Sequence, residues 1–206
     1  MRVSREKAEE NRRTVIETAG RLFRAHGFDG IGLNDLMGAA GLTQGGFYKQ
    51  FKSKEDLAVQ ACDRVLTDSA ERLACLVEGD DDPLATIVTR YLSPAHREEI
   101  GDGCIFAALG GDAVRHSPAL IRSFEKGIHS YLGILDRAML VSLADDGVPD
   151  DPVVVLSTMV GALLLSRLVE DEALSDRILG ATINCLLDRH DGAEARSTMA
   201  DGVRPS

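Results

Sequence analysis

The 206-residue sequence lacks a long hydrophobic run. The longest one, residues 153–165, is too short to cross a bilayer, and no apolar segment of a signal peptide follows the first residues. The four cysteines are scattered, without a C-x-x-C pair: Cys62, Cys75, Cys104 and Cys185. This pattern argues against a disulfide frame and predicts a cytoplasmic protein with reduced thiols and no membrane partner.

Motifs of enzyme active sites are also absent. There is no G-x-S-x-G, no phosphate-binding loop, and no histidine beside a matched partner in any known motif. His96, Cys104 and His116 could be considered as metal ligands, but their spacing fits no zinc pattern. We therefore expect neither an enzyme nor a metal or other cofactor.

A strong positive charge is missing too, because the chain carries a net charge of −10. The charge is uneven, however. Residues 1–57 contain ten Lys/Arg against eight Asp/Glu, whereas residues 58–206 contain thirteen against twenty-five. The N-terminal quarter is thus the part that could face a phosphate backbone without strong repulsion.

Sustained two-residue alternation of apolar and polar residues does not occur, so we expect no strands. Apolar residues recur instead at helical spacing, and four helix starts are marked by proline behind a capping residue: Asp82-Pro83, Ser93-Pro94, Ser117-Pro118 and Asp151-Pro152. The stretch SKED predicts a further start, with Ser53 as the N-cap. The sequence therefore predicts an all-α fold that ends in a disordered tail over residues 191–206.

Two short helices joined by a turn at Gly41-Leu42 are predicted over residues 33–50, with Thr43 capping the second one. Gly45 and Gly46 weaken that second helix. They would allow its backbone to approach DNA closely in a helix-turn-helix, and its free N–H groups could bind phosphate. The motif alone favours the alternative, in which they mark a turn in an ordinary pair of surface helices.

The flanking pattern is more specific. A helix ending in LFRAHGFDGIGL is followed by DLMGAAGLTQGGFYKQFKSKEDL. This order resembles the N-terminal domain of the TetR/AcrR family of transcriptional repressors over about residues 12–65. The GC pair that opens a helix before the long helix at Ser117-Pro118 is similar to the LmrA/YxaF-like branch of that family. At Ile31 and Gly32 the chain departs from the family, which commonly has Thr or Ser there, so the second helix should start less firmly.

The resemblance implies a palindromic double-stranded DNA operator as partner, and side-chain chemistry assigns the roles. The Gln44 amide suits adenine, whereas the Thr43 and Tyr48 hydroxyls suit phosphate oxygens. Lys49 could contact phosphate or guanine. The predicted DNA-binding set is Thr43, Gln44, Gly45, Gly46, Tyr48, Lys49, Lys52 and Lys54. The family pattern supports Tyr48 and Lys54 in particular, although solvated surface positions are the ordinary fate of lysines.

The last two helices are strongly apolar, and the resemblance implies that they pair with a second copy over about residues 152–189. An intrachain core is the alternative. Between them and the DNA-binding part, a small hydrophobic effector is expected in a pocket formed by Cys104, Phe106, Phe124, His129 and Tyr131, although such residues are more often plain core. Cys104 at a helix start could instead be a redox or electrophile sensor, or a quiet packing residue.

These features predict a helix-turn-helix DNA-binding domain over residues 8–68, with the motif at about 32–51, and a larger helical ligand-binding and dimerisation domain over residues 69–190. The expected function is that of a ligand-responsive homodimeric repressor. A thiol-based repressor that senses through Cys104 is one alternative. A helical protein-interaction module is another, but it leaves the locally basic motif unexplained.

Overall fold

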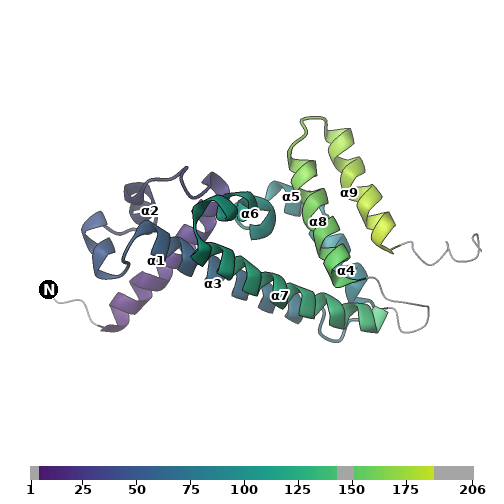
Figure 1. Cartoon of the computed structure of the whole chain (residues 1–206), viewed down its shortest axis with the longest axis horizontal. Coiled ribbons are helices and arrows are strands. Elements are labelled where there is room, and N and C mark those ends of the chain that lie inside the picture. The colour runs from purple at the N-terminus through teal and green to yellow at the C-terminus, as the bar shows by residue number, and fades with distance from the viewer. Residues whose placement is uncertain (1–4, 143–150, 188–206) are drawn as a thin grey trace, which may run out of the picture.

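The computed structural model describes residues 5–142 and 151–187, and every regular element in these two stretches is helical. The predicted all-α fold is thereby confirmed. The predicted tail at residues 191–206 lies outside the described residues. Figure 1 shows the N-terminal elements at one end of an elongated molecule and a pair of C-terminal helices at the other.

The N-terminal unit consists of α1 (Arg5–His26), α2 (Leu33–Ala39), the 3-10 helix η1 (Gln44–Lys49) and the first turns of α3 (Lys54–Leu76). α1 ends at Gly27, whose φ of 77° suits glycine and whose N–H donates to Phe23 O at 2.8 Å. α3 begins where predicted, since the Ser53 hydroxyl accepts from Asp56 N at 3.0 Å.

The remaining helices are α4 (Pro83–Tyr91), α5 (Pro94–Glu98), α6 (Ile105–His116), α7 (Pro118–Ser142), α8 (Pro152–Arg167) and α9 (Glu172–Leu187). All four predicted Asp-Pro and Ser-Pro starts are confirmed. In each of them the Asp or Ser side chain accepts a hydrogen bond from a backbone N–H of the first helical turn. Local chemistry therefore specifies where these helices start.

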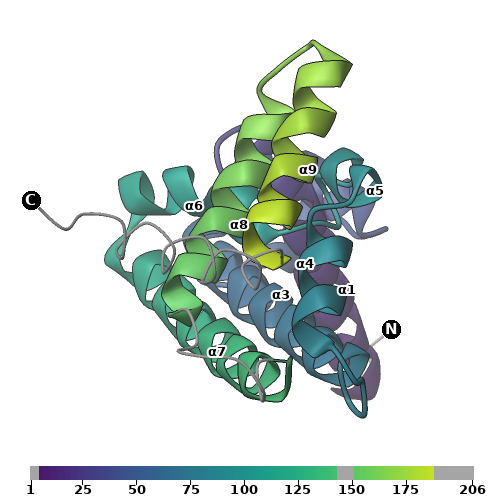
Figure 2. The same cartoon turned by 90° about the vertical axis from the view of Figure 1, so that its right-hand side faces the viewer.

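Two long helices, α3 and α7, run side by side along the molecule (Figures 1 and 2). Their close approach depends on Gly127, because a Cβ there would lie 2.5 Å from Leu66 Cδ2. At Gly20 of α1, a Cβ would likewise lie 2.7 Å from Val65 Cγ2. Small residues at these crossings thus place α3 against both α1 and α7.

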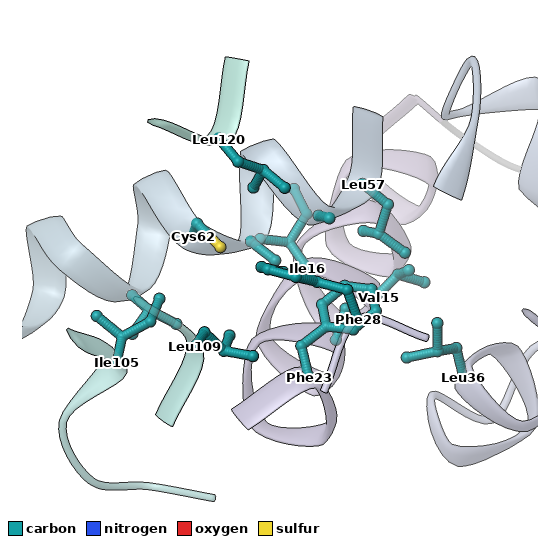
Figure 3. Packing of buried hydrophobic residues seen from close by; sticks show 14 of the residues in the cluster. Val15, Ile16, Phe23, Phe28, Leu36, Leu57, Cys62, Ile105, Leu109 and Leu120 are labelled. Atoms are coloured by element: carbon teal, nitrogen blue, oxygen red, sulfur yellow. The ribbon is translucent and has the colours of Figure 1, made fainter. Parts of the chain in front are cut away.

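The buried side chains form two clusters. The first joins α1, α2, η1 and the start of α3 to α6 and the start of α7, through residues such as Phe23, Leu109 and Leu120 (Figure 3). The second joins α4, the rest of α7, α8 and α9. α3 passes from one cluster to the other between Leu66 and Ala70, next to the predicted domain boundary at residue 68, which stays a prediction.

Candidate DNA-binding surface and buried polar cluster

A small hydrophobic core lies beneath the helix-turn-helix. Leu36, Phe47 and Phe51 are buried in the first cluster together with Phe23, and the rings of Phe47 and Phe51 stack at 5.3 Å. This core fixes which face of residues 43–49 points outward.

The predicted α-helix at residues 44–50 is wrong in type, because the segment is the 3-10 helix η1. Its backbone hydrogen bonds span three residues rather than four: Gly46 N donates to Thr43 O at 3.0 Å, and Gln50 N donates to Phe47 O at 2.8 Å. Two adjacent glycines and a length of six residues give an α-helix little local support, so the tighter form is unsurprising.

The predicted cap at Thr43 is also wrong in one respect. Thr43 occupies the N-cap position with extended backbone, but its side chain accepts no capping hydrogen bond. At the next helix the Asp56 carboxylate accepts from Lys52 N at 2.9 Å, and this bond is the main reason why the pKa of Asp56 is lowered. The turn between η1 and α3 is thus held by a hydrogen bond, whereas the exposed Thr43 hydroxyl makes no capping bond and can accept another partner.

The side chains predicted to meet DNA lie outside the core. Tyr48 is 70% exposed, although its ring touches the fully buried Phe47 edge-on at 5.1 Å. Thr43, Gln44, Lys49 and Lys52 are exposed, and Lys54 is half-buried at the first position of α3. None of the three lysines forms a salt bridge with any residue that the structure describes. The segment therefore presents three cations on an otherwise acidic protein.

Gly45 and Gly46 have no structural need to be glycine. A Cβ at either position would meet no atom within 4 Å, and neither residue has a positive φ. Because the fold itself would accept a side chain at both positions, the reason for two glycines must lie outside the packing of the chain.

The helix-turn-helix region matches the model of the family described as bacterial regulatory proteins, tetR family, over residues 15–61. The chain is a TetR-family regulator. It is 23% identical to the transcriptional repressor DhaR of Mycobacterium sp. strain GP1, across 85% of this chain and 92% of DhaR. The crystal structure of reduced Escherichia coli NemR superimposes with a TM-score of 0.73 at 22% identity, covering 87% of this chain and 96% of NemR.

Because the chain matches TetR-family repressors, the protein is a DNA-binding transcriptional repressor rather than an enzyme. The Bacillus subtilis regulator LmrA is 31% identical over 36% of this chain and 40% of its own length. That match is confined to part of each chain, so the LmrA/YxaF-like branch stays a prediction. No helix in the described part of the chain is long and apolar enough to cross a membrane.

The C-terminal helices of this TetR-family protein leave one apolar face uncovered. Along α8 the large exposed aliphatic residues lie in two groups, near the start and near the end of the helix, and all fall within one third of the helix circumference. They are Val153, Val154, Leu164, Leu165 and, just past the helix end, Leu168. Leu174 of α9 is exposed as well. The opposite face of α8, with Leu156 and Leu163, is buried against the chain.

The residues predicted to line a pocket are only partly brought together. Phe106 meets Phe124 and Tyr131 with ring centroids 5.9 and 5.3 Å apart. Cys104 and Tyr131 are buried in the same cluster, which Phe106 packs against. His129 is exposed, since it lies two residues from Tyr131 and thus on the other side of α7. The structure therefore removes His129 from the group.

A hollow of about 310 Å³ lies elsewhere, between the end of α3, the start of α4 and the end of α7. Its apolar lining comes from Ala74, Val77, Pro83, Ile134, Ala138 and Val141. Arg137 and Glu78 contribute charge at this hollow. None of the five predicted pocket residues lines it, and sequence reasoning missed it because its walls come from three separate helices.

Cys104 is the N-cap residue of α6, but burial raises the pKa of its thiol. Burial thus outweighs the helix-start effect that the sequence suggested. Tyr91 and Arg167 near this thiol were not foreseen, and His96 had been considered with Cys104 only as a metal ligand. Cys104 N donates to His96 Nε2 at 3.0 Å, and His96 Nδ1 lies 2.6 Å from Tyr91 O. Arg167 Nη1 is buried without a hydrogen-bond partner within the described chain, and the buried Tyr91 hydroxyl interacts with the Cys104 thiol.

These contacts fix the tautomer of His96. Because Nε2 accepts from Cys104 N, the proton of the neutral ring lies on Nδ1 and is donated to Tyr91 O. Burial lowers the pKa of His96 below 6.5. Protonation would place a second N–H against that of Cys104, so the folded protein favours the neutral ring. The hydrogen bond to Tyr91 O and the charge of Glu99 act in the opposite direction, whereas Arg167 and Arg90 further oppose protonation.

We expect this histidine to make folding stability dependent on pH. Since the pKa is lower in the folded state, the unfolded state binds more protons as pH falls below about 6.5, and stability is lost from there toward the folded pKa. Urea unfolding at pH 7.5 and 5.5 should show a larger loss for wild type than for His96→Gln, whose amide can still accept and donate. An equal loss in both proteins would contradict this role for His96.

Proposed function

We propose that this TetR-family protein is a homodimeric repressor that binds a palindromic operator and leaves it when a small hydrophobic effector binds the C-terminal helices. The observation that carries the proposal is the exposed surface over residues 43–54. It combines three lysines that form no salt bridge with the described residues, an exposed tyrosine and two glycines that the fold does not require.

The contacts follow from the chemistry of this surface. Gln44 at the start of η1 reads a base edge, and the Thr43 and Tyr48 hydroxyls hold phosphate oxygens. Lys49, Lys52 and Lys54 supply charge to the same backbone, Lys54 from the start of α3. Gly45 and Gly46 allow the main chain of η1 to lie close to the groove.

A dimer is supported by the apolar face of α8. An exposed aliphatic stripe of this kind is costly to leave in water, and pairing with the same stripe of a second copy would bury it in a closed interface. Two recognition elements about 34–36 Å apart could then contact successive major grooves. The effector would favour a state in which α3 swings and that separation changes.

Binding to DNA from upstream of the protein's own gene tests the proposal, measured over a series of salt concentrations with wild type and Tyr48→Ala. Wild type should prefer a palindromic segment over random DNA, with affinity that falls steeply with salt because phosphate contacts release counterions. Tyr48→Ala should bind about tenfold more weakly, from loss of a contact worth about 1.4 kcal/mol. Its melting temperature should stay near that of wild type, because Tyr48 is exposed.

Failure of wild type to prefer any sequence in a random-sequence selection would overturn the operator proposal and favour the protein-interaction module. Equal affinity of both proteins for a selected palindrome would remove Tyr48 from the contact set while leaving the repressor function in place. Lys126→Ala, which removes an exposed lysine from α7, is a control for the loss of an exposed side chain outside this surface.

A second candidate is a thiol-based repressor, and the polar cluster around Cys104 favours it. Arg167 lies close enough to favour the Cys104 thiolate, even though burial keeps the pKa of that thiol raised. Hydrogen peroxide or iodoacetamide should then abolish operator binding by wild type but not by Cys104→Ser. Cys75→Ser, which removes an exposed thiol, should behave like wild type. Persistent inactivation of Cys104→Ser would exclude this candidate.

A further inference from the structure

Residues 96–104, which comprise the end of α5 and the loop to α6, are held from two sides; we call them the coupling segment. On the C-terminal side, Arg167 of α8 donates from Nε to Arg97 O at 2.9 Å and from Nη2 to His96 O at 2.8 Å. Arg97 in turn donates to Ser175 Oγ and pairs with Asp176 of α9, at 2.8 and 2.7 Å. The start of the coupling segment is thus fastened to both helices of the proposed dimer interface.

On the N-terminal side, two arginines of α1 contact residues 101 and 102 of the same segment. Arg24 is only 8% exposed, and its Nε donates to Gly101 O at 2.6 Å. Its Nη2 lies 3.9 Å from Asp102 Oδ1, while the exposed Arg21 lies 3.4 Å from Asp102 Oδ2. Arg24 lies in the last turn of α1, next to the Gly27 bend that leads into α2.

The coupling segment leaves little space for independent movement of these contacts. A Cβ at Gly103 would lie 2.2 Å from Glu99 O and 3.0 Å from Arg167 Nη2. A Cβ at Gly101 would already touch Arg21 Cγ at 3.4 Å. The hydrogen bond from Cys104 N to His96 Nε2 closes the segment on itself. A displacement at one end is therefore transmitted to the other rather than absorbed.

We propose that Arg24 and Arg167 are positioning residues for operator binding: through the coupling segment, they make the position of α1, and with it the helix-turn-helix, depend on the position of α8. This rests on the proposed repressor function. It adds a polar connection to the one through the continuous helix α3.

Buried guanidinium groups suit this role. Burial lowers the pKa of both arginines because it removes water from the charge, so each group depends on its protein acceptors. Glutamine at either position would remove the charge and the reach to the carbonyls. Lysine at position 24 would keep one donor and the charge, and should therefore restore part of the effect.

A double-mutant cycle on the full-length dimer tests the connection, with affinity for the selected palindrome as the readout. Arg24→Gln and Arg167→Gln should each weaken binding by about tenfold, a usual size for coupling between sites. The double variant should also bind about tenfold more weakly, because either substitution alone already breaks the connection and the second then causes little further loss of affinity. Arg21→Gln, which removes an exposed partner of Asp102, should change affinity less than threefold. Arg24→Lys should lie between wild type and Arg24→Gln.

Two independent structural roles would instead multiply to about a hundredfold loss in the double variant, and that result would overturn the inference. Circular dichroism and sedimentation should show that each variant is folded and in the wild-type assembly state.

Hydrogen exchange on DNA-free protein provides a test that does not require an operator. Arg167→Gln should raise exchange in the last turn of α1, and Arg24→Gln should raise it in the last turn of α8. Changes that stop within the coupling segment would overturn the inference even if operator binding is normal. Absence of sequence preference in wild type would instead count against the proposed function alone.

Discussion

Leu165→Glu should convert the protein to a monomer and abolish operator binding at concentrations where wild type binds. Leu165 is 55% exposed and lies in the C-terminal part of the uncovered α8 stripe, with Leu164 beside it and Leu168 one turn on. In a symmetric dimer, the substitution buries a carboxylate in both copies without a partner. Such a charge costs several kcal/mol, so the dimer dissociation constant should rise by at least about a hundredfold.

Sedimentation velocity and operator titration measure the two effects. Val114→Glu is the control, because Val114 is a large apolar residue on α6 that is 73% exposed and lies outside the stripe. It should leave both the assembly state and DNA affinity near those of wild type. If Leu165→Glu stays dimeric, the α8 face is not the interface, and the exposed stripe must serve another contact.

The helix starts were predictable because each depends on a few neighbouring residues. An Asp or Ser before proline specifies both the backbone turn and the acceptor for the first N–H groups, and no distant contact is needed. The helix-turn-helix core was predictable for a similar reason, since the spacing of Leu36, Phe47 and Phe51 determines one shared inward face. Recognition of the family then added the direction in which the opposite face points.

The C-terminal site could not be read in the same way. α7 is a 25-residue helix that packs against several others. Helical spacing alone places Tyr131 and His129 on opposite sides of it, but only the packed structure shows that Tyr131 is the buried one. The polar cluster was missed for another reason. Arg167 meets the carbonyl of Arg97 across 70 residues of sequence, and a backbone acceptor has no sequence signature. The sign of the Cys104 pKa shift likewise depends on burial, which only the packed structure shows.

Gly45 is where stability and function should respond in opposite directions. Replacing a helical glycine by alanine stabilises a protein by about 0.4–1 kcal/mol when no clash results, and a Cβ at Gly45 meets nothing within 4 Å. Gly45→Ala should therefore unfold at slightly higher denaturant concentration than wild type. Operator affinity should nevertheless fall, by about tenfold for alanine and about a hundredfold for Gly45→Val, as the added atoms hold η1 away from the groove.

Gly133→Ala in the middle of α7 is the matched control, because its Cβ would meet only Arg137 Nη1 at 3.8 Å. It should stabilise the protein without changing operator affinity. A graded loss with side-chain size at position 45, in a protein that is no less stable, would show that DNA requires this glycine and the fold does not. Unchanged affinity in Gly45→Val would mean that η1 does not lie against the groove, and the contact would have to come from Lys52 and Lys54 at the start of α3.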